Sequence, residues 1–150
     1  MEDAATQLAQ FIAKFDPAVA TRGQAIIERL KTRLPAANLL VYDNYNALAV
    51  GFCPDERSRH MILSVAFYPR WVSLFLTRVI GLPDPGKILK GSGTTVRHIV
   101  INDPAELDRP DIAAFIDHAA RHAEPPLPPS GQGRLIIKSI SEKQRLRRPN

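Results

Sequence analysis

Short apolar runs joined by short polar connections fill the middle of the sequence, and this pattern limits the possible folds more than any other feature. The runs are Leu39–Tyr42, Tyr45–Phe52, His60–Phe67, Trp71–Leu76 and Val96–Ile101. Their lengths suit β-strands, and the first four follow one another too closely for a helix to cross between them. The pattern therefore predicts an antiparallel meander sheet of about five strands rather than a parallel sheet.

Helical periodicity flanks these strands on both sides. Apolar residues spaced i, i+3, i+4 and i+7 predict an amphipathic helix over residues 4–15, and Asp16-Pro17 begins a second helix that ends before Pro35. A third helix is expected over residues 105–123, with a core face of Ile112, Phe115, Ile116, Ala119 and Ala123. The predicted fold class is α+β: two N-terminal helices, the meander sheet, and a C-terminal helix packed on the sheet, with the helices covering one face.

The sequence divides into a body, a linker and a tail. Residues 1–123 form the predicted α+β domain, residues 124–133 are a stiff proline-rich linker, and residues 134–150 are a basic tail that includes a possible short strand, Leu135–Ile140. The tail holds six basic residues and one acidic residue, so it carries the whole net charge of +5. We expect a solvated tail whose deletion leaves the body folded; the alternative is a nucleic-acid contact through phosphate neutralisation.

Composition excludes several classes of protein. No apolar run approaches the ~20 residues of a membrane span, and the start of the chain, Met1-Glu2-Asp3, has no features of a secretory signal. Cys53 is the single cysteine, which excludes an internal disulfide and a zinc site built from cysteines. A cytoplasmic, reducing location and no membrane partner are therefore expected.

Five segments in a fixed order carry a resemblance to a known family. They are Tyr42–Leu48, Tyr68–Val72, Leu82–Pro85, Leu89–Gly93 and Val96–Ile99. With them, residues 5–123 resemble the YdhG-like family of bacterial domains of unknown function, some of whose relatives are described as frataxin-like iron chaperones. The resemblance implies an α+β fold with an antiparallel sheet. It implies no established reaction and no catalytic residues.

The densest turn chemistry lies in the loop Asp84–Gly93. It is not a phosphate-binding P-loop, because Gly91 is followed by Ser92 instead of lysine and a strand comes next where a helix is required. Its glycines allow backbone N–H groups to converge on an anion, and Lys87, Lys90 and Arg97 add positive charge. The alternative is a crossover loop whose glycines satisfy local geometry and whose lysines face water.

Four aromatic residues sit at strand ends or hairpin turns, namely Tyr42, Tyr45, Tyr68 and Trp71. Together with Arg70 they are candidates to line a pocket for a planar or acidic ligand, although aromatic residues in such places also close the end of a sheet core. Asp43 is expected to serve only its own turn. The predicted ligand-binding residues are Tyr42, Tyr45, Tyr68, Arg70, Trp71, Lys87, Lys90, Gly91, Ser92 and Arg97.

The last predicted helix carries His118 and His122 at i, i+4, a spacing that allows both to bind one metal ion. Asp111 lies too far along the helix, about 10 Å from His118, to join them. The other acids of this region, Glu106, Asp108 and Asp117, wrap around the helix and its start. An iron-handling protein that uses these acids and histidines is the alternative that the resemblance suggests.

The sequence thus favours a non-catalytic binding domain for a small anionic or polar ligand, in a pocket beside the loop Asp84–Gly93. No catalytic motif of the hydrolase, metalloprotease or dinucleotide-binding kind is present, so no catalytic residues are assigned. No cofactor is expected, except iron under the chaperone alternative. The possible partners are a small molecule or anion and, through the tail, nucleic acid. The ligand's identity and the oligomeric state stay open.

Overall fold

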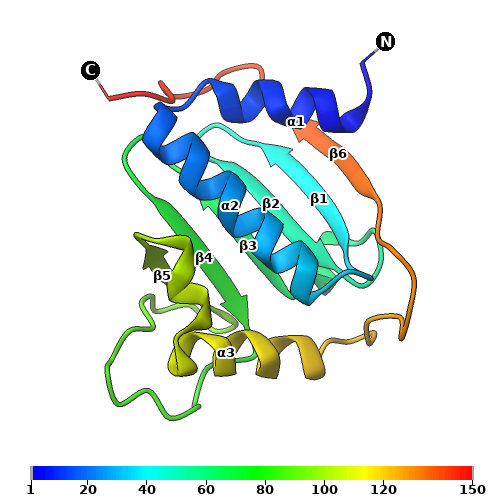
Figure 1. The fold of residues 1–150 in the computed structure, drawn as a ribbon, viewed down its shortest axis with the longest axis vertical. Coiled ribbons are helices and arrows are strands. Elements are labelled where there is room, and N and C mark those ends of the chain that lie inside the picture. Colours follow the sequence, from blue (N-terminus) through cyan, green and yellow to red (C-terminus); the bar gives the residue numbers. More distant parts are fainter. Residues whose placement is uncertain (1, 150) are drawn as a thin grey trace.

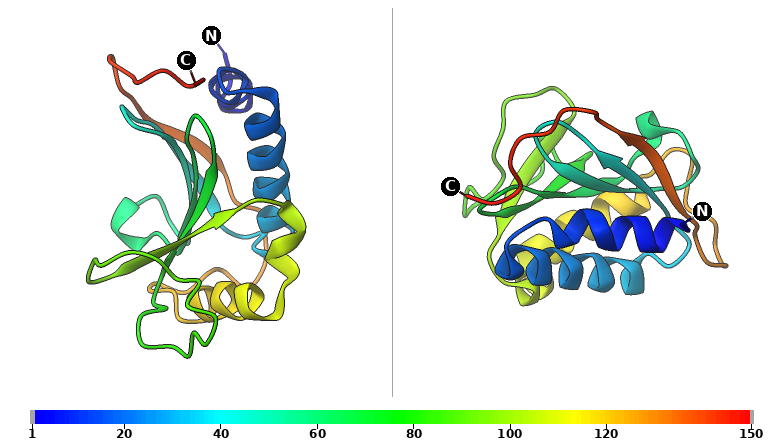
Figure 2. Two further views of the ribbon diagram at one scale, coloured as in Figure 1. Left: turned by 90° about the vertical axis from the view of Figure 1, so that its left-hand side faces the viewer. Right: turned by 90° about the horizontal axis from the view of Figure 1, so that it is seen from above.

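The structure is a computed structural model that describes residues 2–149. The protein has an α+β fold in which helices pack on a six-stranded mixed sheet. Helices α1 (Ala4–Ala13), α2 (Pro17–Arg33) and α3 (Pro110–Arg121) all contribute side chains to one hydrophobic core. Figure 2 shows α1 and α2 on one side of the sheet, whereas the opposite side carries mainly loops. The predicted fold class, with two N-terminal helices and a C-terminal helix, is confirmed.

Five strands form the predicted meander. Strands β1 (Asn38–Asp43), β2 (Leu48–Cys53), β3 (Leu63–Phe67), β4 (Val72–Thr77) and β5 (Val96–Ile101) pair antiparallel in succession. A sixth strand, β6 (Leu135–Ile140), pairs with β1 in parallel, so the order is β5-β4-β3-β2-β1-β6. The purely antiparallel sheet predicted from the sequence is therefore wrong at this edge, where the tail returns beside β1 (Figure 1).

The third helix begins later than predicted. Residues 105–123 were expected to be continuous, but a short 3-10 helix, η2 (Pro104–Asp108), comes first, and α3 begins at Pro110. Pro110 disfavours helical geometry at Arg109 and cannot donate a hydrogen bond back into a preceding turn. Asp103 and Glu106 form a capping box on η2, so the local sequence supports two elements instead of one.

The core lies between the helices and one face of the sheet. Alternate strand residues point into it, such as Val72, Leu74 and Leu76 of β4, and the residues between them point to the opposite face. Gly23 allows α2 to approach the sheet, because a Cβ there would lie 2.1 Å from the Phe67 ring. The face turned away from the helices is called the open face below.

The tail is an integral part of the fold. Gly133 passes so close to Ala37 that a Cβ would lie 1.7 Å from the Ala37 carbonyl oxygen, and β6 follows directly. Farther along, Arg147 is buried and its Nη2 lies 2.9 Å from Oδ1 of buried Asp43. The possible strand Leu135–Ile140 is thus present as β6 and docks on the domain, whereas the expectation of solvated charge is wrong for Arg147. Asp43 does more than serve its own turn.

Candidate functional site

Every second residue of each strand points to the open face, so side chains from neighbouring strands lie side by side there. The strand register aligns Ser64 of β3, Phe75 of β4 and His98 of β5 in one row across this face. At one end of the row's strands, the η1 segment (Ser58–His60, a 3-10 helix) lies over the same face, and the crossover loop between β4 and β5 returns beside it (Figure 2). These three parts of the chain enclose a pocket.

The pocket has a volume of about 620 Å³, within the range of ~300–1,000 Å³ that is typical of small-molecule sites. It combines an apolar floor with a polar rim. The apolar lining residues are Met61, Phe75, Ile80, Val96 and Leu63, of which Leu63 has its side chain in the core. The rim consists of Ser58, Arg59, Ser64, Thr77, Arg78, Thr94 and Thr95. The lining thus combines two arginines and five residues with hydroxyl groups with apolar residues, and none of the residues that line the pocket in the described chain is acidic.

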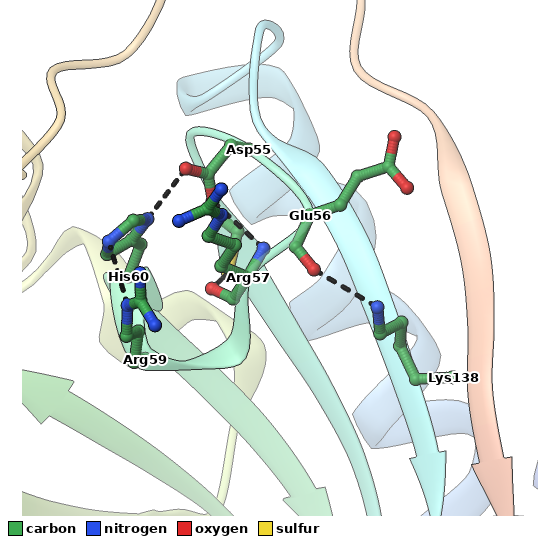
Figure 3. A network of polar contacts seen from close by, with 7 residues as sticks. Asp55, Glu56, Arg57, Arg59, His60 and Lys138 are labelled. Atoms are coloured by element: carbon green, nitrogen blue, oxygen red, sulfur yellow. Dashed lines mark hydrogen bonds and ion pairs between the residues drawn. The ribbon is translucent and has the colours of Figure 1, made fainter.

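A network of polar contacts holds the η1 segment in place (Figure 3). Asp55 Oδ2 accepts a hydrogen bond of 2.6 Å from His60 Nδ1, and Asp55 Oδ1 accepts one of 3.0 Å from the Arg57 amide. Because Nδ1 of His60 carries the proton, Nε2 is left to accept from Nε of Arg59, at 3.4 Å. The Asp55–His60 pair thereby helps to hold Arg59 at the rim of the pocket.

Hydrogen bonds and a nearby positive charge keep the Asp55 carboxyl in its charged form. Burial acts to raise the pKa of this carboxyl, but the hydrogen bonds from the Arg57 amide and from His60, with the charge of Arg57, lower the pKa overall. The network also reaches β6, since Lys138 Nζ donates to the Glu56 carbonyl oxygen at 3.1 Å. The tail therefore supports the loop that carries Arg59 (Figure 3).

Arg78 adopts a backbone conformation that is uncommon for residues other than glycine. Its φ is 61°, and its Nη1 donates to Thr77 Oγ1 at 3.0 Å. The Thr77 hydroxyl in turn donates to the Ile62 carbonyl oxygen at 2.7 Å. A left-handed residue that is not glycine costs ~1 kcal/mol or more, and such strain is concentrated at functional sites. Here it turns the chain out of β4 while Arg78 stays at the rim of the pocket.

Several amides in the middle of the loop Asp84–Gly93 form hydrogen bonds within the protein. The Asp84 carboxylate accepts from the Ile88 and Leu89 amides, both at 3.0 Å. Lys90 forms two backbone hydrogen bonds with His98, each 2.9 Å, and its ammonium donates to the Lys87 carbonyl oxygen. Asp84 thus occupies the amides of Ile88 and Leu89, and anion binding by the glycine amides and the lysines stays a prediction.

The other predicted residues of the loop also serve local geometry. Arg97 donates to the carbonyl oxygens of Gly93 and Val96, and Gly91 has a φ of 115°, a conformation that favours glycine. Ser92 is exposed beside it. Their involvement in binding stays a prediction as well.

The predicted aromatic residues lie in two separate places. Tyr68 and Trp71 stack with ring centroids 4.7 Å apart on the open face, next to exposed Arg70, and burial raises the pKa of Tyr68. Tyr42 belongs to β1, four strand spacings from β5, a distance of about 19 Å. Tyr45 lies beyond the end of β1, with Arg145 over its ring. The sequence-predicted ligand residues therefore do not surround one common pocket, and none of them lines the pocket described above.

The histidines of α3 stack on each other, and the acids of η2 and α3 form ion pairs with arginines. His118 and His122 stack at 4.1 Å, and burial, with the charges of His122 and Arg121, lowers the pKa of His118. Asp108 pairs with Arg29, Asp117 with Arg33 and Asp111 with Arg109. Among residues 2–149, no three side chains of the metal-binding kinds are grouped closely enough to hold an ion. Metal binding by the two histidines stays untested.

Sequence reasoning missed the residues that form the pocket. Ser58 and Arg59 lie in a polar loop without a motif, and Thr77 and Arg78 come at the end of a strand. The only available signal was the pairing of β3 with β4, because that register brings the loop before β3 next to the residues after β4.

Comparison of the chain with protein-family models, with curated proteins and with solved structures gives no match. Within residues 2–149, no helix combines the length and the apolar character that crossing a membrane requires.

Proposed function

We propose that the protein is a binding domain for a small molecule that has an anionic group and an apolar part, held in the pocket between η1, β4 and the crossover loop. The observation that supports this most directly is the placement of Arg59 and Arg78 around an apolar floor. An apolar pocket with a few polar groups that converge on it is the usual form of a small-ligand site.

The chemistry of the rim favours an anion over a cation. Guanidinium groups bind carboxylates and phosphates through two parallel hydrogen bonds, and hydroxyl groups add further donors. Phe75 and Met61 offer apolar surface to the remainder of the ligand. The pocket is formed in part by residues at the two ends of the crossover loop, Ile80, Thr94 and Thr95, and not by the loop Asp84–Gly93 itself.

The resemblance to the YdhG-like family implies no established reaction, and membership of that family is part of this proposal. His60 and Asp55 are used to hold the η1 segment, and we assign them no chemical step.

Phenyl phosphate, with benzyl alcohol as its neutral analogue, tests the proposal. We expect phenyl phosphate to shift the NMR amide signals of residues 58–61 and 94–96, and benzyl alcohol to shift them much less. Arg59→Gln should weaken the binding of phenyl phosphate about tenfold, which corresponds to one lost charge-assisted hydrogen bond.

Arg121→Gln is the matched control, because Arg121 is an exposed arginine at the end of α3, outside the pocket. It should leave the affinity unchanged. Equal shifts by both compounds, or equal losses in the two arginine variants, would show that the pocket does not select an anion.

A further inference from the structure

Two pairs of flat rings lie on the open face of the sheet. Tyr68 and Trp71 stack at 4.7 Å, and Phe75 and His98 lie at 5.1 Å with their planes tilted by 31°. All four rings are at least partly exposed, and 40 % of Trp71 is accessible to solvent. Flat, exposed side chains on one sheet face are the means by which several folds stack unpaired bases.

The two ring pairs lie in line along β4. Trp71 precedes the strand and Phe75 lies within it, four residues later, which is about 13 Å at ~3.3 Å per residue. Bases within one strand of a duplex are only ~3.4 Å apart, so a nucleic acid that used both positions would have to be single-stranded and unstacked. Between the two ring pairs the open face carries the small side chains of Ala66 and Ser73, which protrude less than the rings.

The charges near the rings favour a polyanion. Arg70 is exposed in the turn beside Trp71, and Arg59 and Arg78 lie at the other end of β4. The residues of β3, β4 and β5 that point to the open face include no acid; they are Ser64, Ala66, Ser73, Phe75, Thr77, Val96, His98 and Val100. A track of rings between two basic ends matches the alternation of bases and phosphates in a single strand.

We infer that the open face of β3, β4 and β5 binds single-stranded nucleic acid. The Tyr68–Trp71 and Phe75–His98 pairs stack bases, and Arg70 and Arg59 hold phosphates at the two ends. This inference goes beyond the proposed function, because Tyr68, Trp71, His98 and Arg70 lie outside the pocket, whereas Phe75 and Arg59 also line it. It also differs from a contact through the basic tail, in which Arg147 is buried.

The protein carries its own probe for the test. Trp71 is the only tryptophan in the sequence, so its fluorescence reports on this face alone. We expect a single-stranded oligothymidylate to quench the fluorescence of Trp71, and a duplex of the same length to quench it much less, because paired bases are not free to stack. The affinity for the single strand should fall steeply as the salt concentration rises.

Two variants locate the site. Phe75→Leu keeps apolar volume but removes a flat ring, and it should weaken binding of the oligothymidylate about tenfold, as expected for the loss of one stacked base. Arg70→Gln changes an exposed residue in a turn, so we expect it to leave the fold intact. It should weaken binding and reduce the slope of log affinity against log salt by about one.

Lys143→Gln in the tail is the control and should change neither quantity. Equal binding of single strand and duplex, no quenching of Trp71, or a loss of binding only in the tail variant would each overturn the inference. Phenyl phosphate binding is measured separately by NMR, so a failure here does not decide the pocket proposal, and the reverse also holds.

Discussion

Arg147 and Asp43 form a buried ion pair between residues 104 positions apart, with 4 % and 1 % of their side chains exposed. Arg147 also donates to the carbonyl oxygens of Asn44 and Tyr45, and its guanidinium lies 5.5 Å from the centre of the Phe15 ring. Within the described chain, Asp43 Oδ2 and Arg147 Nε have no hydrogen-bond partner. The pair is therefore enclosed but not fully satisfied, and the loss of either charge would expose the other to an apolar surrounding.

Arg147→Met should lower the free energy of unfolding by ~3–5 kcal/mol, because it leaves the Asp43 carboxylate buried without its cation. The double variant Asp43→Leu, Arg147→Met should regain most of this loss, since apolar side chains of similar volume often replace a buried pair without cost. Urea denaturation of both variants measures the difference. Lys143→Met, an exposed tail residue, should change stability by no more than ~0.5 kcal/mol. Equal losses in the single and double variants would contradict the account.

Cys53 is a second residue whose environment decides its chemistry. Burial, and then the negative charge of Asp55, raise the pKa of this thiol to about 12 from an ordinary value of 9.0, against the opposing charge of Lys138. The folded state therefore favours the protonated thiol. Its contribution to stability is present below pH 9 and is lost as the pH rises toward 12.

We expect the folded protein to react with a disulfide reagent such as DTNB far more slowly at pH 8 than the chain unfolded in guanidinium, because only the thiolate is a nucleophile. As the pH increases, the rate of the folded protein should keep rising beyond pH 9, where the unfolded chain reaches its plateau. The absorbance of the released thiolate measures both rates. A plateau of the folded protein near pH 9 would mean that the thiol is not shifted.

Among the elements, β6 begins at a close approach of two backbone segments. The Gly133 amide donates to the Pro35 carbonyl oxygen at 2.9 Å, and the Leu39 amide donates to that of Arg134 at 2.8 Å. Between these two bonds, the Cα of Gly133 faces the Ala37 carbonyl with no room for a side chain. The parallel pairing of β6 with β1 thus starts at Gly133, where no side chain can be accommodated.

Gly133→Ala should displace the start of β6 and raise the rate of amide hydrogen exchange at Leu39 and along β1, while β3 and β4 keep their protection. NMR-detected exchange distinguishes these strands. Gly86→Ala is the matched control, because a Cβ there meets its nearest neighbour at 3.5 Å, an ordinary contact. If exchange is unchanged at Leu39 in the Gly133 variant, the close approach does not determine the docking of β6.

For the molecule as a whole, sequence patterns predicted the elements whose partners are neighbours in the chain. The alternation of apolar residues predicted β1 to β5 and their order, because each strand pairs with its neighbour in the chain. The parallel partner of β1 was missed, since Asn38 and Arg134 make contact across 96 positions and neither carries a signal of the other. Arg147 had the same appearance as the exposed bases beside it.

The sequence did not predict the residues that line the candidate pocket. Glycines and lysines drew attention to the loop Asp84–Gly93, yet the sequence does not reveal that Asp84 takes up two of its amides. Arg59 and Arg78 meet only through the register of β3 with β4. A site built from the ends of paired strands becomes visible once the pairing is known.

The parallel pairing of β6 and the burial of Arg147 impose an order on synthesis as well as on structure. Asp43 is translated 104 residues before Arg147, an interval of about 5–20 s at ~5–20 residues per second. Throughout that time β1 is an unpaired sheet edge that ends in a carboxylate without its cation, a template for pairing with other chains. A nascent chain can complete the helices and the meander first, but the free edge of β1 is covered only when β6 has emerged.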